Sequence, residues 1–172
     1  MSGGTLYAQY YGWTFKTAPG TKKWKGNMGI RLDKKIPLLG WREWVSLPAL
    51  GIPHIKAKVD TGARTSALHA FANEIYYERG VKMVRFKLHP WQKRTDIEQS
   101  CAAEVIDERV VSDSGGHRER RLVIVTQVCL DDHCWPIEMT LTNRDNMQFR
   151  MLLGRTAIRG LYAVDPAASY LV

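Results

Sequence analysis

The sequence predicts an all-β fold in which short strands close into a barrel. After position 38, most apolar residues recur in short runs that alternate with polar residues, the period-2 pattern of half-buried strands. A helical pattern is confined to residues 154–160, one or two turns closed by Gly160. Glycine- and proline-containing turns separate the predicted strands, which are residues 41–47, 55–59, 81–88, 101–111, 122–130, 135–141 and 164–171.

Residues 1–37 form a segment of different composition. Every periodic run in it is interrupted by a glycine: Gly3, Gly4, Gly12, Gly20, Gly26 or Gly29. A chain of 172 residues with 45% hydrophobic residues is long enough to bury one core. We therefore expect an N-terminal extension over residues 1–37, partly disordered or packed through its aromatic residues, and one domain over residues 38–172.

The charge balance favours acidic partners. Lys and Arg outnumber Asp and Glu by 25 to 17, which gives a net charge of +8. An Arg-rich run at residues 118–121 and six Trp residues are compatible with nucleic acid binding, but the charge is not clustered and no nucleic-acid module signature occurs. We therefore do not expect nucleic acid as a partner, and a solvated basic surface explains the charge at least as well.

Two further absences in the sequence bear on location. No run approaches the roughly 18 apolar residues that a membrane span needs. The first ten residues lack the basic start and the apolar core of a signal peptide. We expect a cytoplasmic protein without a membrane partner.

Asp60, Thr61 and Gly62 directly follow the predicted strand at residues 55–59. Gly62 permits a turn that a side chain would obstruct, and neighbouring N–H groups and the Thr61 hydroxyl can hold the Asp60 carboxylate towards a ligand. Acid–base catalysis by carboxylates normally uses a pair. The sequence has one Asp-Thr-Gly, so a symmetric homodimer would supply the second aspartate. The alternative is an ordinary tight turn capped by Asp60.

A second segment, residues 151–155, reads Met-Leu-Leu-Gly-Arg and lies downstream of this turn. Together the two segments resemble the retropepsin-like aspartic peptidases. Further motifs are similar to a bacterial branch that was labelled ATP-dependent zinc proteases and is associated with ATP-grasp amino-acid ligases. The resemblance covers residues 38–172, and its motifs are residues 40–45, 56–70, 114–121, 135–138 and 141–144.

The resemblance implies a closed acid-protease barrel with Asp60, Thr61 and Gly62 at its catalytic centre. A hydrophobic-Gly segment would support this turn from beneath, formed here by Leu152, Leu153, Gly154 and Arg155. A Gly-rich hairpin tip at residues 112–117 would cover the substrate as a flap, and an ordinary surface hairpin is the alternative. The substrate-binding residues would be Ala63, Arg64, Gly115, Gly116, His117, Arg118 and Arg120.

Arg64 departs from the pattern that this resemblance implies. Many viral members carry an acid at that place, two residues after the glycine, where it pairs with the arginine of the hydrophobic-Gly-Arg segment. Arg155 therefore needs another partner, and an arginine at position 64 favours a carboxylate as ligand. The candidate partners of Arg155 are Asp145, Glu138 and Asp165.

We expect no metal site, although the older family label names zinc. His-Glu-x-x-His is absent, and Cys129 and Cys134 do not have the spacing of a Cys-x-x-Cys pair. His69 and His89 could be ligands, but structural histidines are commoner. Together with Cys101, the cysteines are compatible with buried thiols in a reducing compartment.

Two functions of different classes follow from these patterns. The first is an aspartic endopeptidase that works as a homodimer on peptide or protein substrates, acidic or glutamate-extended ones among them, without a cofactor. The second is a binding or regulatory partner of an ATP-grasp ligase that keeps the fold without hydrolysis. The zinc-dependent protease of the older label is a further alternative.

Overall fold

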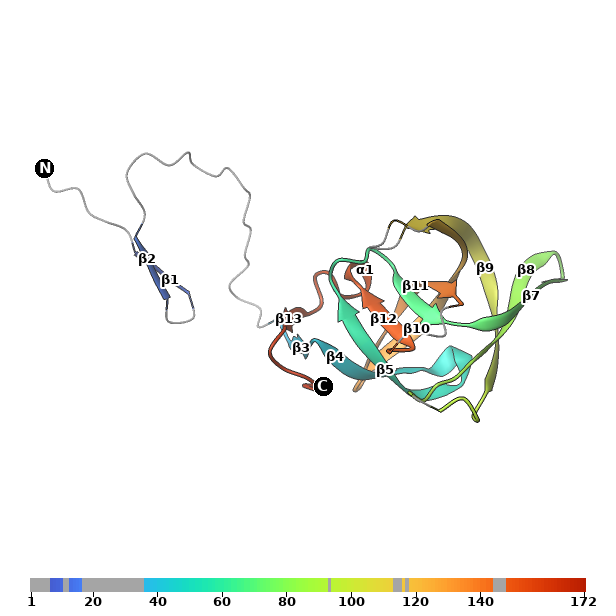
Figure 1. Cartoon of the computed structure of the whole chain (residues 1–172), viewed down its shortest axis with the longest axis horizontal. Helices are drawn as coiled ribbons and strands as arrows, with labels where there is room; N and C mark the ends of the chain where they lie inside the picture. The colour runs from blue at the N-terminus through green and yellow to red at the C-terminus, as the bar shows by residue number, and fades with distance from the viewer. Residues whose placement is uncertain are drawn as a thin grey trace, which may run out of the picture. The chain divides into compact units, whose positions relative to one another are not determined.

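A computed structural model describes residues 7–10, 13–16, 36–92, 94–112, 116, 118–143 and 148–172 of the chain (Figure 1). It divides into two units, Met1–Lys35 and Ile36–Val172. In the first unit, β1 (Tyr7–Tyr10) pairs antiparallel with β2 (Trp13–Lys16), a hairpin for which the sequence pattern predicted no element. We predicted that residues 1–37 are partly disordered or packed through aromatic side chains. These predictions concern residues and side chains outside the part of the chain that the structure describes.

The second unit is mostly β with one short helix, as predicted. Each strand predicted between residues 41 and 141 is confirmed to within a few residues, and the helix begins at Arg155. The elements are β3 (Leu38–Gly40), β4 (Arg42–Leu47), the 3-10 helix η1 (Pro48–Leu50), β5 (Ile52–Asp60), β6 (Ser66–His69), β7 (Phe71–Glu78), β8 (Val81–Leu88), β9 (Gln99–Ser112), β10 (Arg118–Leu130), β11 (His133–Thr142), β12 (Met151–Gly154), α1 (Arg155–Ile158) and β13 (Ala163–Asp165).

Nine of these strands form one sheet in the order β11-β6-β12-β5-β4-β10-β9-β8-β7. Strand β12 runs parallel to β5 and antiparallel to β6, while β11 runs parallel to β6. Strand β10 pairs with β11 as well, but its link to β4 is the single residue pair Cys129 and Ser46. The sheet thus curls back on itself, and the closed barrel stays a prediction. The β7–β8 hairpin extends away from this body (Figure 1).

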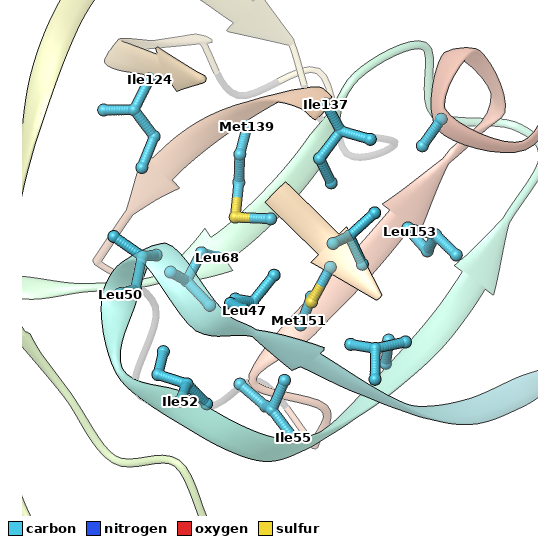
Figure 2. Close-up of a cluster of buried hydrophobic side chains, with 14 of the residues drawn as sticks. Leu47, Leu50, Ile52, Ile55, Leu68, Ile124, Ile137, Met139, Met151 and Leu153 are labelled. Carbon is cyan, nitrogen blue, oxygen red and sulfur yellow. The ribbon is translucent and has the colours of Figure 1, made fainter. Parts of the chain in front are cut away.

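The core lies inside the curled part of the sheet. Figure 2 shows side chains of Ile55, Leu68, Met139 and Met151 converging from β5, β6, β11 and β12, and all four are fully buried. Burying each such side chain contributes roughly 1.5–3 kcal/mol. Because Ile55, Ala57 and Val59 of β5 face this core, the intervening Lys56, Lys58 and Asp60 face outward.

The segment after β13 is not the strand that the sequence predicted for residues 164–171. Strand β13 ends at Asp165 and pairs parallel with β3. Beyond it, the fully buried carboxylate of Glu43 accepts hydrogen bonds from the N–H groups of Leu171 and Val172, at 3.1 and 3.4 Å. Because these two N–H groups donate to a side chain, they are not paired with a neighbouring strand.

The prediction that all three cysteines are buried thiols is wrong. Cys129 and Cys134 are directly opposite each other in the β10–β11 hairpin, and they form a disulfide. Their side chains share one face of the hairpin because antiparallel partners point to the same side. Only the thiol of Cys101 is free among the described cysteines, and burial raises its pKa to about 11.

No helix among the described residues is long and apolar enough to cross a membrane.

Candidate active site

The turn at residues 60–63 holds the Asp60 carboxylate in a fixed orientation. Asp60 is the last residue of β5 and is half-buried. Its Oδ1 accepts hydrogen bonds from the backbone N–H groups of Gly62 and Ala63, at 3.0 and 3.1 Å. Oδ2 has no hydrogen-bond partner within the part of the chain that the structure describes, and neither does the Thr61 hydroxyl. One carboxylate oxygen is therefore anchored while the other remains available to a ligand.

Gly154 packs directly against this turn. Strand β12 lies parallel to β5, with Gly154 opposite Asp60, and the Gly154 N–H donates to Ser66 Oγ at 3.1 Å. A Cβ atom at Gly154 would stand 2.5 Å from the carbonyl carbon of Thr65 and 2.7 Å from the Ser66 nitrogen. Both are backbone atoms, so only glycine permits this approach. Leu153 is fully buried in the core, whereas Leu152 faces the cleft.

Arg155 donates hydrogen bonds to main-chain carbonyl oxygens of the turn and not to an acidic side chain. Its Nη1 donates to the carbonyl oxygen of Thr61 at 3.0 Å, and its own N–H donates to the carbonyl of Ala63 at 2.8 Å. The acids considered from the sequence have other roles: Glu138 binds Arg109, and Asp165 accepts from the Ala167 N–H. Asp145 lies outside the described residues.

A cleft of about 980 Å³ opens in front of Asp60. Its lining includes the predicted site residues Asp60, Gly62, Ala63 and Arg64. The β9–β10 hairpin also lines the cleft, through Arg109, Val110, Val111, Ser112 and Arg121. The hairpin predicted as a flap therefore borders the cleft, although its action as a flap remains a prediction.

The arginines of this hairpin differ in their placement from the sequence expectation. Arg109 and Arg121 are cross-strand partners on the face that borders the cleft. Arg118 and Arg120 belong to the opposite face, and neither lines the cleft; Arg120 lies 3.7 Å from Glu108. Strict alternation along residues 118–121 was the signal that could have separated the two sets. Of the tip, Gly116 is exposed, while Gly115 and His117 lie outside the described residues.

Ion pairs hold the cleft arginines in place. Arg109 donates to Glu138 of β11 and to Asp107, and Arg121 donates to Glu119 at 2.8 Å. The hydrogen bond from Arg109 lowers the pKa of Glu138 below its usual 4.5, with a smaller contribution from the nearby charge of Arg64. Arg64 itself is exposed and has no ion pair within the described part of the chain. The cleft thus presents a free cation close to Asp60.

The donor set does not fit the zinc of the older family label. Within the described ranges, no three His, Cys, Asp or Glu side chains converge as metal ligands would. The rings of His69 and His89 stack at 6.3 Å between centroids, against Phe71. Cys129 and Cys134 are bonded to each other, so neither offers a thiolate.

Comparison with known proteins places the chain in a family. A model of the RimB-like family, described as the retropepsin-like aspartic endopeptidase RimB, matches residues 38–172. Probable alpha-L-glutamate ligases from Shewanella halifaxensis and Desulfotalea psychrophila are each 46% identical to the chain, over 133 and 142 residues. These matches cover 77% and 81% of this chain but 29% and 30% of the relatives, so the chain spans less than a third of their length.

A solved structure is also similar. The crystal structure of a Legionella pneumophila protein of unknown function (DUF785) is 27% identical, with a TM-score of 0.66. The match covers 78% of this chain and 97% of that one. Since the family model matches most of the chain, the protein belongs to the RimB-like family of retropepsin-like aspartic endopeptidases.

Proposed function

We propose that the protein is an aspartic endopeptidase that acts as a symmetric homodimer. The observation that carries the proposal is the Asp60 turn. Two backbone N–H groups hold one carboxylate oxygen, Asp60 lines a large cleft, and Gly154 of β12 and Arg155 of α1 brace the turn. A tight turn with only a capping role does not require such bracing or such a cleft.

The chemistry follows from two such carboxylates that share a proton. The ionised Asp60 takes a proton from a water molecule, whose oxygen attacks the scissile carbonyl carbon. The protonated Asp60 of the second copy donates its hydrogen bond to the carbonyl oxygen and stabilises the developing negative charge. Collapse of the tetrahedral intermediate breaks the C–N bond as the Asp60 that accepted the proton from water passes it to the leaving nitrogen, which returns the pair to its starting state with one shared proton. Each chain supplies one Asp-Thr-Gly, so the mechanism needs two chains.

Acidic peptides, including glutamate-extended ones, are the substrates that we propose. Arg64 lines the cleft and has no ion pair in the described part of the chain, whereas Arg109 and Arg121, which line the same cleft, are already paired with acids of this chain. Guanidinium groups bind carboxylates in a bidentate manner. The relatives named probable alpha-L-glutamate ligase also support a glutamate-containing substrate. The cytoplasm is the proposed location.

A second candidate function is a binding or regulatory role beside an ATP-grasp ligase, without hydrolysis. It is favoured by one observation: the similar region is less than a third of proteins that are named for a ligase. A chain that keeps the fold and the basic cleft could serve such a protein as a binding module.

The deciding experiment is digestion of a peptide library that contains matched Glu, Gln and Lys sequences. We expect wild type to cleave Glu peptides preferentially, and Asp60→Asn to lose about 10³-fold or more of the activity while it stays folded. Asp132→Asn, at the exposed β10–β11 turn, is the matched control. Full activity in Asp60→Asn would eliminate the aspartic mechanism, and loss of activity in EDTA would restore the zinc-dependent alternative.

If wild type cleaves nothing in the library, the non-hydrolytic role is favoured. Binding of a purified ATP-grasp ligase, measured by calorimetry with wild type and Asp60→Asn, then becomes the test. Equal binding by both forms would support a module whose carboxylate has no chemical role.

A further inference from the structure

An array of aromatic and basic side chains covers the outward face of β4 and β5. It includes side chains from the segments after β8 and β13 as well as from the two strands. We call it the aromatic–basic platform, and its members are Trp41, Arg42, Trp44, Lys56, Trp91 and Tyr170.

Three rings of the platform are neighbours. The ring of Trp44 lies 6.2 Å from that of Trp91 and 6.3 Å from that of Tyr170, between centroids. Trp44 and Tyr170 are stacked, with 28° between their planes. Trp91 is 42% exposed and Tyr170 is 37% exposed. Large aromatic side chains with this exposure are available to a ligand.

The cations of the platform lie among these rings. The guanidinium of Arg42 is 4.5 Å from the Trp41 ring centroid and 5.0 Å from that of Tyr170. Lys56 Nζ is 4.8 Å from the Trp44 centroid. Cation–π contacts of this kind orient a cation without neutralising its charge.

The cations of this face outnumber its acids, since the one acid on the outward side of β4 and β5 is Asp60, at the end of β5. Neither Arg42 nor Lys56 has an acidic partner within the described residues, and Arg42 Nε donates only to Ser169 Oγ, at 3.3 Å. Exposed Lys58 is directly opposite Arg42 in the β4–β5 ladder, a like-charge pair that destabilises a sheet. Glu43, the one acid of β4, turns inward and is fully buried. The outward face therefore attracts an anion.

We propose that the aromatic–basic platform, together with Lys58, binds single-stranded nucleic acid. Phosphate groups contact the cations Arg42, Lys56 and Lys58. Successive bases stack on exposed aromatic rings, as on other single-strand binding surfaces. This partner differs from the expectation drawn from composition, because folding gathers residues that are far apart in the sequence.

The rings decide between nucleic acid and an acidic peptide. The face of an aromatic ring carries the negative end of its quadrupole, so it disfavours a carboxylate. A base has a π-face of its own and stacks on the ring. Duplexes keep their bases stacked inside, so they would contact the cations alone.

The platform ends at a cavity of about 270 Å³ lined by Trp41, Lys58, Arg121 and Phe149. The rings of Trp41 and Phe149 meet edge to face at 5.7 Å. Ala67, Arg121 and Leu152 line both this cavity and the Asp60 cleft. A strand bound along the platform would thus place its last base beside the cleft.

The test is fluorescence anisotropy with labelled oligonucleotides of about twelve nucleotides, as single-stranded RNA, single-stranded DNA and duplex, at about 50 and 200 mM salt. We expect single strands to bind more tightly than the duplex, with affinity that falls at higher salt. Trp44→Leu and Tyr170→Leu should each weaken binding roughly ten-fold by the loss of stacking. Lys56→Gln should reduce the salt dependence of binding.

Lys87→Gln is the matched control, because Lys87 is an exposed lysine of β8 that pairs with Glu98 at 2.7 Å. It removes the same net charge from a strand that contributes no residue to the platform, and its binding should equal that of wild type. Circular dichroism verifies that each variant is folded. Equal binding of duplex and single strand, or equal losses in Lys56→Gln and Lys87→Gln, would overturn the proposal. Binding of a labelled poly-glutamate peptide, but not of oligonucleotides, in a Trp44-dependent manner would identify a peptide site instead.

Discussion

Arg155 fixes the backbone on which the orientation of Asp60 depends. Its Nη1 hydrogen bond to the Thr61 carbonyl is the only side-chain bond to that turn from another element within the described residues. We expect Arg155→Gln to lower kcat about 10- to 100-fold with little change in KM, because small displacements of a catalytic group are costly. Stability should change by less than about 1 kcal/mol, as is typical of exposed polar sites.

The control for this prediction is Arg159→Gln, which removes an exposed arginine just after α1. It should leave kcat unchanged. Equal effects of the two substitutions on kcat would mean that the charge near α1, and not the bond to Thr61, matters.

Substitution by alanine should have different effects at Gly154 and at Gly62, mainly on stability at the first and mainly on activity at the second. At Gly154 a Cβ atom would meet the backbone of Thr65 and Ser66, at 2.5 and 2.7 Å, so we expect a loss of about 1–3 kcal/mol of stability. At Gly62 the nearest atom is Asp60 Oδ1 at 3.3 Å, so Gly62→Ala should disturb the carboxylate and lower activity more than stability. Urea unfolding monitored by fluorescence measures the first effect, and a similar loss in both variants would contradict this assignment.

Sequence reasoning could locate Asp60 and Gly154 but not their partners. The alternating pattern of β5 ends at Asp60, and such a pattern can be recognised from consecutive residues alone. Arg155 was expected to bind an acid, yet its partner is a main-chain carbonyl, and backbone acceptors leave no trace in residue identity. Arg121 was grouped with Arg118 and Arg120 as a cation of the hairpin, because which face each one occupies depends on the register between β9 and β10.

At the scale of elements, the Arg109–Glu138 pair ties the β9–β10 hairpin to β11. Arg109 lowers the pKa of Glu138 below 4.5, so the tie is present above that pH and is lost as the pH falls through the lowered pKa. We expect hydrogen-exchange protection factors, which correct for the intrinsic effect of pH, to fall in residues 109–112 and 118–121 under acid conditions. Glu138→Gln should show low protection at neutral pH and little change on acidification.

Glu104→Gln is a suitable control, since Glu104 is an exposed acid of β9 without an ion pair in the described ranges. It should retain both the protection and its pH dependence. Unchanged protection in Glu138→Gln would show that main-chain pairing alone holds the hairpin.

The strands that the sequence revealed are those with one buried face. Strand β4 alternates strictly between half-buried and buried residues, and the sequence pattern located it correctly. Strand β6 is buried at every position, between β11 and β12, so it has no period-2 signal. Strand β7 is the edge of the sheet and has no buried position, which removes the signal in the opposite way. Neither β6 nor β7 could therefore be predicted without knowing which strands lie beside it.

At the scale of the whole molecule, the peptidase mechanism requires two copies, because each chain has one Asp-Thr-Gly. We expect sedimentation velocity to show a dimer at tens of micromolar, or a dimer that forms when substrate is added. A monomer under both conditions would contradict the shared site. The total charge of +8 opposes association, so the dimer fraction should rise with salt.

Subunit mixing tests whether the two copies share one site. Asp60→Asn chains should still pair with wild-type chains, since the substitution keeps the size of the side chain, but a mixed pair has one carboxylate only. If every active site needs two, then after exchange the activity is proportional to the square of the wild-type fraction; independent sites would give a linear dependence. The control replaces the variant with an inert protein at equal mass. A linear dependence, with exchange verified by mass spectrometry of mixed dimers, would mean that each chain works alone and that Asp60 uses a partner other than its symmetry mate.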